Sequence, residues 1–170
     1  MSAKTLPDYL ASGLRLVFVG TNPGLYSAET GHYFATPRNR FWRAMSLAQL
    51  VEGDFGPEHD HLLQRHGIGF TDLVKRPTSG AAELTAQDFR QGAPILKEKL
   101  LRYQPKIVSF HGVMAYGNYL KFAESAKERL ELGMQSRTIG RSRIFVTPNP
   151  SPANAAYSLD ALAEWYLRLK

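Results

Sequence analysis

The chain has 170 residues and carries 21 lysines and arginines against 15 aspartates and glutamates, a net charge of +6. A chain of this length can bury a core of its own, so we expect a single domain over residues 1–170, and the basic excess favours either a polyanionic partner or a solvated basic surface. The absence of cysteine excludes disulfides, thiolate catalysis and cysteine-ligated metal clusters. Because no apolar stretch suits a membrane span or a signal peptide, we expect a soluble intracellular protein, cytoplasmic or nucleoid-associated, with no membrane partner.

The first half of the chain alternates short apolar runs with helical patterns. LRLVFV (Leu14–Val19) is a continuous apolar run with the length of a buried strand, and a long loop to about Pro37 follows it. Asn39–Leu50 has apolar residues at helical spacing, while Pro57 and Gly67 stand where helices commonly begin and end. We therefore predict, in order, a short helix over Thr5–Ala11, a strand over Leu14–Val19, a helix over Asn39–Leu50, a helix over Pro57–His66 and an extended segment over Ile68–Val74.

The second half continues this alternation. Thr85 and Asp88 resemble the capping box of a helix that runs to about Tyr103, and Ser158 caps a final amphipathic helix. Strands that alternate with helices favour parallel pairing through right-handed crossovers. We expect an α/β fold, a three-layer α/β/α sandwich in which four predicted strands form a short, mostly parallel sheet. The remaining predicted elements are a strand over Lys106–Phe110, a helix over Val113–Phe122 and a strand over Arg143–Thr147.

Two polar loops rich in Pro and Gly follow the first and the last predicted strands. They are GTNPGLYSAET (Gly20–Thr30) and NPSPANA (Asn149–Ala155). Open α/β sheets bind their ligands at the carboxyl ends of strands, so both loops are candidate binding segments. In the first loop, Gly20 and Gly24 let the backbone approach a ligand closely, and Pro23 stiffens the turn.

Two side chains near these strand ends carry chemistry. The Asn22 amide is essentially non-basic, but it can orient a water or bind a carbonyl group; a tight turn in which Asn22 caps its own backbone is the alternative. Asp72 lies at the end of the second predicted strand, where a carboxylate could deprotonate or polarise a water. Its alternative roles are a turn residue or a salt bridge to Lys75 or Arg76.

The second loop suits a phosphate backbone. Ser151 and several backbone N–H groups can donate to a phosphate, Pro152 makes the loop rigid, and Ala153 is small enough to enter a groove. Basic side chains that would either follow phosphates or only solubilise the surface are Arg38, Arg40, Lys75, Arg76, Arg137, Arg141 and Arg143.

Aromatic residues near the first loop divide into two groups. Phe41 and Trp42 have helical spacing and are expected in the core. Tyr33 and Phe34 lie outside any periodic pattern and are better candidates for stacking on a planar base, an interaction worth about 1–3 kcal/mol.

The histidines do not indicate a metal site. His59 and His61 are two residues apart, so a helix would not place them on one face. His111, at the end of the third predicted strand, either faces the cleft or caps the next helix. We expect neither a metal nor a cofactor.

Four segments together resemble the mismatch-specific uracil/thymine DNA glycosylases of the uracil-DNA glycosylase superfamily: GTNPGLYSAETGHYFATPRNRFW, GIGFTDLVKRPT, YQPKIVSFHG and PNPSPANA. They occur in order from about Leu16 to the final helix, and the pattern G-x-x-F-x-x-P-x-N-x-F-W at Gly31–Trp42 is specific. The resemblance implies a mostly parallel four-stranded sheet and a metal-free, monofunctional enzyme without a cofactor. Such an enzyme flips a damaged or mismatched base out of DNA and cleaves its bond to deoxyribose.

The resemblance also implies roles for individual residues. Asn22 matches the family's catalytic asparagine, which positions the attacking water, and Phe34 matches the aromatic residue that stacks on the extruded base. The loop Asn149–Ala155 matches the one that enters the minor groove and fills the vacated space. The expected substrate-binding residues are Gly20, Thr21, Pro23, Gly24, Tyr33, Phe34 and Thr71, and the expected DNA-binding residues are Asn149, Ser151, Pro152, Ala153 and Asn154.

The chain departs from the family pattern in two ways. Asp72 stands where family members carry Lys or Asn, so we hypothesise that it shares or dominates catalysis as a base or an electrostatic stabiliser. Ala153 and Ala155 replace a larger wedge and an arginine, which predicts weak discrimination of the opposite base and activity on single strands. We expect a monomer that acts on uracil-containing or mismatched double-stranded DNA. The alternatives are a glycosylase for hypoxanthine, xanthine or etheno adducts, a non-catalytic mismatch binder, and an unrelated nucleotide-binding domain.

Overall fold

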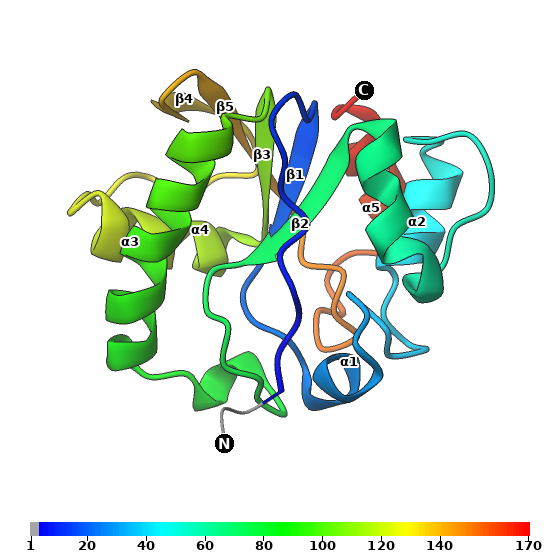
Figure 1. The fold of residues 1–170 in the computed structure, drawn as a ribbon, viewed down its shortest axis with the longest axis horizontal. Coiled ribbons are helices and arrows are strands. Elements are labelled where there is room, and N and C mark those ends of the chain that lie inside the picture. Colours follow the sequence, from blue (N-terminus) through cyan, green and yellow to red (C-terminus); the bar gives the residue numbers. More distant parts are fainter. Residues whose placement is uncertain (1–3) are drawn as a thin grey trace.

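The computed structural model describes residues 4–170, which form one sheet with helices on both faces (Figure 1). The sheet has five strands in the order β2-β1-β3-β5-β4. All neighbours pair in parallel except β4, which runs antiparallel to β5. The carboxyl ends of β2, β1, β3 and β5 therefore meet at one edge. The strands are β1 (Leu16–Gly20), β2 (Ile68–Asp72), β3 (Ile107–His111), β4 (Gly133–Ile139) and β5 (Ser142–Thr147).

The prediction of four strands was wrong because β4 has no apolar run. Its sequence, GMQSRTI, is buried only at Gly133 and Ile139. Backbone pairing with β5 holds this edge strand, and an edge strand needs little apolar surface. The hydrophobic pattern therefore gives no sign of it.

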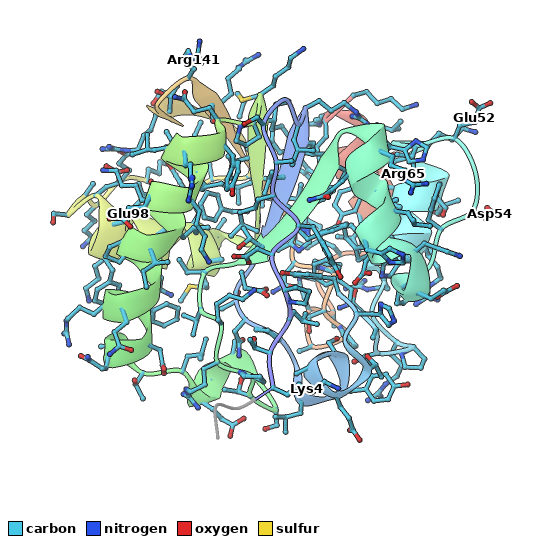
Figure 2. All side chains as sticks on the ribbon, viewed as in Figure 1. Lys4, Glu52, Asp54, Arg65, Glu98 and Arg141 are labelled. Atoms are coloured by element: carbon cyan, nitrogen blue, oxygen red, sulfur yellow. The ribbon has the colours of Figure 1, made fainter. Side chains whose placement is uncertain are left out.

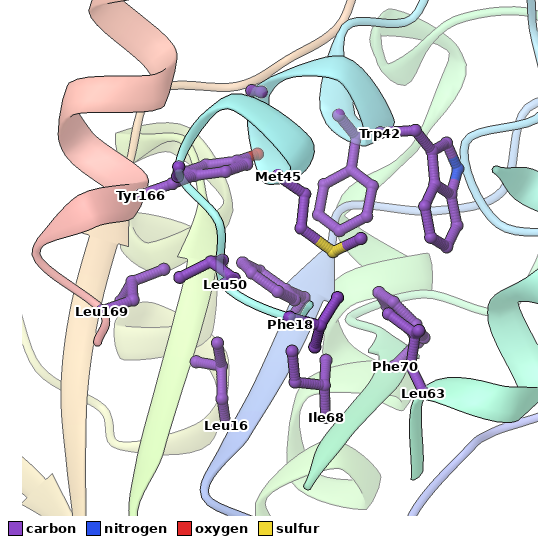
Figure 3. Packing of buried hydrophobic residues seen from close by; sticks show 14 of the residues in the cluster. Leu16, Phe18, Trp42, Met45, Leu50, Leu63, Ile68, Phe70, Tyr166 and Leu169 are labelled. Atoms are coloured by element: carbon purple, nitrogen blue, oxygen red, sulfur yellow. The ribbon is translucent and has the colours of Figure 1, made fainter. Parts of the chain in front are cut away.

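The helices form two layers because successive side chains of a strand point to opposite faces of the sheet. On one face, Phe18 and Phe70 pack against α2 and α5, as Figure 3 shows. On the other face, Val108 and Phe110 pack against α3 and α4. The predicted α/β/α arrangement is confirmed. The helices are α1 (Leu25–Thr30), α2 (Phe41–Leu47), α3 (Ala86–Tyr103), α4 (Val113–Ala123) and α5 (Leu159–Leu167), with 3-10 helices η1 (Pro57–His66) and η2 (Ala81–Glu83).

The local signals in the second half were reliable. Helix α3 begins with the predicted capping box: the Thr85 N–H donates to Asp88 Oδ2 at 2.8 Å, and the Asp88 N–H donates to Thr85 Oγ1 at 3.4 Å. In the first half, Pro57–His66 is a 3-10 helix rather than an α-helix, and α1 occupies part of the predicted loop. Within residues 4–170, no helix has the length and apolar character needed to cross a bilayer.

The helix predicted over Thr5–Ala11 is absent, and Tyr9 instead pairs with Phe70 of β2. The Tyr9 N–H donates to the Phe70 carbonyl at 2.8 Å, and the Phe70 N–H donates to the Tyr9 carbonyl at 3.0 Å. Strand β2 lies at the edge of the sheet and has backbone groups to pair, which outweighs the weak helical preference of a segment containing Pro7. A Cβ at Gly69 would lie 2.2 Å from the Tyr9 carbonyl oxygen, so this close pairing requires glycine.

Gly92 in α3 provides a stability prediction with an inverted sign. Gly→Ala inside a helix ordinarily stabilises it by about 1 kcal/mol. At Gly92, however, a Cβ would lie 2.3 Å from the Leu73 carbonyl oxygen, so α3 would have to move away from the chain that follows β2. We expect Gly92→Ala to lower the free energy of unfolding by about 1–3 kcal/mol, measured by urea denaturation. Gly80→Ala, where a Cβ meets nothing within 4 Å, is the control and should change it little.

Candidate active site

A cavity of about 330 Å³ lies at the carboxyl edge of the sheet, between the loops that follow β1 and β5. Parallel pairing on either side of β3 brings these loops together, although the strands that carry them end 127 residues apart, at Gly20 and Thr147. Thr71, Ala153 and Asn154 are not among the residues that line the cavity. Those predicted site residues that do line it are Gly20, Thr21, Asn22, Pro23, Gly24, Tyr33, Phe34, Asp72, Asn149, Ser151 and Pro152.

Asn22 is held by its amide nitrogen. Nδ2 donates to the Arg76 carbonyl at 2.9 Å and to Thr78 Oγ1 at 2.8 Å. The Thr78 hydroxyl in turn donates to the Gly80 carbonyl at 2.8 Å, which fixes it as an acceptor for the amide. The amide oxygen has no such partner among the described residues, so it is the group left to meet a water or a ligand. No signal in the sequence pointed to Thr78 or to the Arg76 carbonyl.

Asp72 lies directly beside Gly20, its partner in the β1–β2 register. The side chain is buried, with 4% of the residue exposed, and Oδ2 accepts no hydrogen bond from the described residues. A Cβ at Gly20 would lie 2.7 Å from Asp72 Oδ1. Glycine at this position therefore makes room for a carboxylate against the floor of the cavity.

Lys75 is the counter-charge of Asp72. Its Nζ lies 3.5 Å from Asp72 Oδ2 and 2.9 Å from Asp8 Oδ1. Burial raises the pKa of Asp72 to about 6, and the Lys75 ammonium opposes this effect. Asp8 also accepts a hydrogen bond from Thr71 Oγ1 at 2.7 Å and pairs with Lys99 at 2.6 Å. Thr71 thus belongs to this network behind the cavity, and the salt bridge to Lys75 that the sequence left open is present.

We expect Lys75→Met to raise the pKa of Asp72 further, by about one unit, because an opposite charge is removed from a buried carboxylate. The groups that face Lys75 are Asp72, Asp8 and the Tyr33 hydroxyl. A carbon-detected NMR titration of the carboxyl groups measures this shift. Lys97→Met, which removes an ion pair with Glu124, is the control and should leave Asp72 unchanged. An Asp72 titration that is identical in Lys75→Met would contradict the assignment.

Phe34 is a half-buried ring in a backbone conformation that few residues adopt. Its φ is +53°, in the left-handed region, which costs a non-glycine residue about 1 kcal/mol or more. The ring packs on Phe41 and His111, with centroids 4.4 and 5.0 Å away. Tyr33 is different: it is 1% exposed, stacks on Phe70 and donates its hydroxyl to the Pro7 carbonyl at 2.8 Å. Tyr33 is therefore part of the buried wall of the cavity, while the half-buried ring of Phe34 is the one on which a planar ligand can stack.

The loop Asn149–Ala155 is held from inside by Arg40. Its guanidinium donates to the carbonyls of Ser151 at 3.2 Å and Asn154 at 2.7 Å, and also to that of Tyr157. The interpretation of Arg40 as a phosphate-tracking residue is replaced by this role, because both terminal nitrogens of its guanidinium donate to carbonyls of the loop and of Tyr157, and its Nε is buried. Pro152 and Ala153 are exposed at the tip.

Most of the other basic candidates are also engaged elsewhere. Arg76 pairs with Asp88 at 2.8 Å, and Arg137 pairs with Glu128 at 2.6 Å. Arg141 and Arg143 stand at the amino end of β5, away from the cavity, and Figure 2 shows Arg141 projecting from that end of the molecule. The one basic candidate that lines the cavity is Arg38.

His111 ends β3 between the two loops and lines the cavity. It is 2% exposed, and burial lowers the pKa of its imidazole to about 3, so the ring is neutral. The structure thus selects the cleft-facing alternative that the sequence left open. Among residues 4–170, no group of three or more His, Cys, Asp or Glu side chains is arranged to hold a metal.

A parallel sheet with a cavity between the loops at its carboxyl edge defines an α/β protein that binds its ligand there. The family model of the uracil DNA glycosylase superfamily matches residues 7–170. The chain therefore belongs to this superfamily and is a DNA glycosylase. The resemblance found in the sequence is confirmed at this level.

The fold has a relative among solved structures. It is similar to the solution NMR structure of a protein from Methanosarcina acetivorans that is provisionally assigned as a uracil DNA glycosylase, with a TM-score of 0.64. The two chains share 21% sequence identity, and the match covers 99% of each. At this identity, the likeness concerns the fold.

Proposed function

We propose that this chain is a monofunctional DNA N-glycosylase of base excision repair, specific for uracil. It hydrolyses the N-glycosidic bond of uracil in G·U mismatches, and also in A·U pairs and single strands. The observation that carries the proposal is one cavity of about 330 Å³ that joins Asn22, Asp72 and Phe34 beside the loop Asn149–Ala155, which suits a phosphate backbone. The enzyme acts on double-stranded DNA as a monomer, in the cytoplasm or on the nucleoid, without a cofactor.

The proposed reaction begins with a flipped base. Unstacking costs a few kcal/mol and costs less for a mispaired base, which by itself favours G·U over A·U. In the cavity, the extruded uracil stacks on Phe34, whose ring is supported by Phe41. Backbone N–H groups near Thr21 and Phe34 stabilise the negative charge that develops on the base.

Hydrolysis then needs one water and one proton acceptor. The bond between C1′ and N1 breaks, which leaves a uracil anion and a sugar with oxocarbenium character. Asn22 Oδ1 orients the attacking water. The oxygen of this water bonds to C1′, and one of its protons passes to the Asp72 carboxylate. The ionised carboxylate also lowers the energy of the cationic sugar. Asp72 thus acts as the general base, and Asn22 acts as the amide that positions the water.

The tip of the second loop sets the dependence on the opposite strand. Pro152 and Ala153 are exposed there, and neither carries a donor side chain for the opposite base. Small residues also make a weak wedge in the vacated space. We therefore propose weak discrimination of the opposite base.

A glycosylase for a larger lesion is the second candidate. A further cavity of about 600 Å³ shares Thr21, His111 and Asn149 with the first. A base larger than uracil, such as hypoxanthine, xanthine or an etheno adduct, would extend from the first cavity into the second.

Single-turnover cleavage of matched oligonucleotides decides between these functions. The substrates carry uracil opposite guanine, uracil opposite adenine, uracil in a single strand, and hypoxanthine opposite thymine. Cleavage of all three uracil substrates supports the proposal, whereas cleavage of hypoxanthine alone supports the second candidate. Binding of the G·U duplex without cleavage of any substrate would overturn the enzymatic reading of this cavity.

A further inference from the structure

His111 is the central side chain of the cavity, because β3 lies between the strands that carry the two loops. Its ring is enclosed by aromatic neighbours on several sides, with centroids 5.0 Å from Phe34, 5.3 Å from Phe18 and 5.6 Å from Phe41. A neutral imidazole has one nitrogen that donates and one that accepts. Which nitrogen carries the hydrogen decides what His111 offers to a ligand.

The hydroxyl of Tyr166, in α5, determines which nitrogen of His111 carries the hydrogen, because it lies next to Nε2. Its side chain is fully buried in the cluster shown in Figure 3, and its hydroxyl lies 3.5 Å from His111 Nε2. Among the described residues, this hydroxyl has no other hydrogen-bond partner. A buried O–H without an acceptor costs about 1–3 kcal/mol. The arrangement in which Tyr166 donates to Nε2 avoids this cost, whereas a hydrogen on Nε2 would leave the hydroxyl hydrogen with no acceptor.

With Tyr166 as the donor to Nε2, the single hydrogen of the neutral His111 ring stands on Nδ1.

Nδ1 is the nitrogen available to the cavity. It makes no hydrogen bond with the described residues, and it is not among the fully enclosed atoms that lack a partner. Because His111 lines both adjoining cavities, an N–H donor at this position meets the edge of a bound base.

We propose that the Tyr166–His111 pair selects deaminated bases: Tyr166 holds Nε2, and Nδ1–H donates to a carbonyl oxygen of the flipped base. Uracil and hypoxanthine have a carbonyl oxygen where cytosine and adenine have an amino group. A donor facing that amino group leaves two donors opposed and unpaired, and such a site discriminates strongly between the two kinds of base. The inference rests on the proposed glycosylase function and names its specificity-determining residue.

The first test does not depend on activity. Long-range proton–nitrogen NMR of the free protein reports the tautomer of His111. We expect the Nδ1–H form in the wild-type protein and a shift toward Nε2–H in Tyr166→Phe, which loses the hydroxyl and keeps the ring. A wild-type His111 in the Nε2–H form would overturn the proposal whatever the enzyme cleaves.

The second test measures selection with DNA that resists cleavage. Duplexes containing 2′-fluoro-deoxyuridine or 2′-fluoro-deoxycytidine opposite guanine are compared for binding. We expect the wild type to prefer the uracil analogue, His111→Leu to lose about tenfold or more of that preference, and His111→Asn, which keeps an N–H donor, to retain most of it. Binding to undamaged DNA should not change in any variant.

The two proposals fail in different ways. If the wild type cleaves uracil while His111→Leu and Tyr166→Phe keep the full preference for the uracil analogue, the selection proposal is wrong and the function stands. If the Nδ1–H tautomer is found but no uracil-containing DNA is bound or cleaved, the proposed function is wrong.

Discussion

Replacing Asn22 with alanine is expected to lower the single-turnover rate of uracil excision about 10²–10³-fold, with little change in DNA affinity. The reason is that Nδ2 is tied to the Arg76 carbonyl and Thr78, so the amide oxygen is preset to orient the water. Removing one preorganised polar group from an active site typically has an effect of about this size. Rapid-quench cleavage of a G·U duplex at saturating enzyme gives the rate.

Thr78→Val tests whether the orientation of the Asn22 amide matters, because it leaves the amide in place but removes one of its hydrogen-bond acceptors. Valine keeps the shape of threonine but removes the acceptor at 2.8 Å, so Asn22 retains only its backbone anchors. We expect an intermediate loss, about tenfold, with a normal unfolding temperature. A Thr78→Val enzyme as fast as the wild type would show that this anchor is not needed, and an Asn22→Ala enzyme as fast as the wild type would remove Asn22 from the mechanism.

Replacing Asp72 with asparagine is expected to lower the excision rate about 100-fold or more at pH 8. The wild-type rate should rise with pH through a midpoint near the Asp72 pKa of about 6, because the ionised form is the one that accepts the proton. Asparagine cannot ionise, so the same pH profile should be flat in the variant. The control, Asp54→Asn, makes the same change of charge on an exposed side chain, which Figure 2 labels at one side of the molecule and which does not line the cavity.

The same group makes a prediction about stability with a defined sign. The pKa of Asp72 is raised by burial from 3.8 to about 6, so between these values the folded protein binds more protons than the unfolded chain. Asp72 therefore costs the folded protein little stability below about pH 4, and it lowers the free energy of unfolding increasingly as the pH rises toward and through about 6. Relative to Asp72→Asn, we expect the wild type to lose on the order of 1 kcal/mol of unfolding free energy between pH 5 and pH 7.

Urea denaturation at the two pH values measures this difference. Equal pH dependence in the wild type and in Asp72→Asn would show that Asp72 titrates normally, and an unchanged cleavage rate in the variant would restore Asn22 as the only residue in the chemistry. Lower stability of Asp72→Asn at both pH values would not affect the test, because only the difference between them is used.

Local patterns in the sequence were sufficient to predict the layers of the fold and the positions of the two loops. Apolar runs as in Leu14–Val19 and Arg143–Thr147 can only be satisfied by burial, so each predicts a central strand wherever it occurs. Loops that follow such strands in a parallel sheet must share one edge, which is why Asn22 and Ser151 were predicted near the same ligand. The capping box at Thr85 was readable because its partners are three residues apart.

The tertiary structure alone decided what those residues do. The anchors of the Asn22 amide are 54 and 56 residues away, the role of Arg40 depends on carbonyls more than 110 residues away, and β4 exists because β5 offers an edge. The same holds for His111, whose neutrality comes from burial and whose tautomer is decided by Tyr166, 55 residues later. Residue types and spacing by themselves determined which groups meet at the sheet edge. Protonation and orientation depend on burial and on long-range hydrogen bonds, and these exist only once the chain has folded.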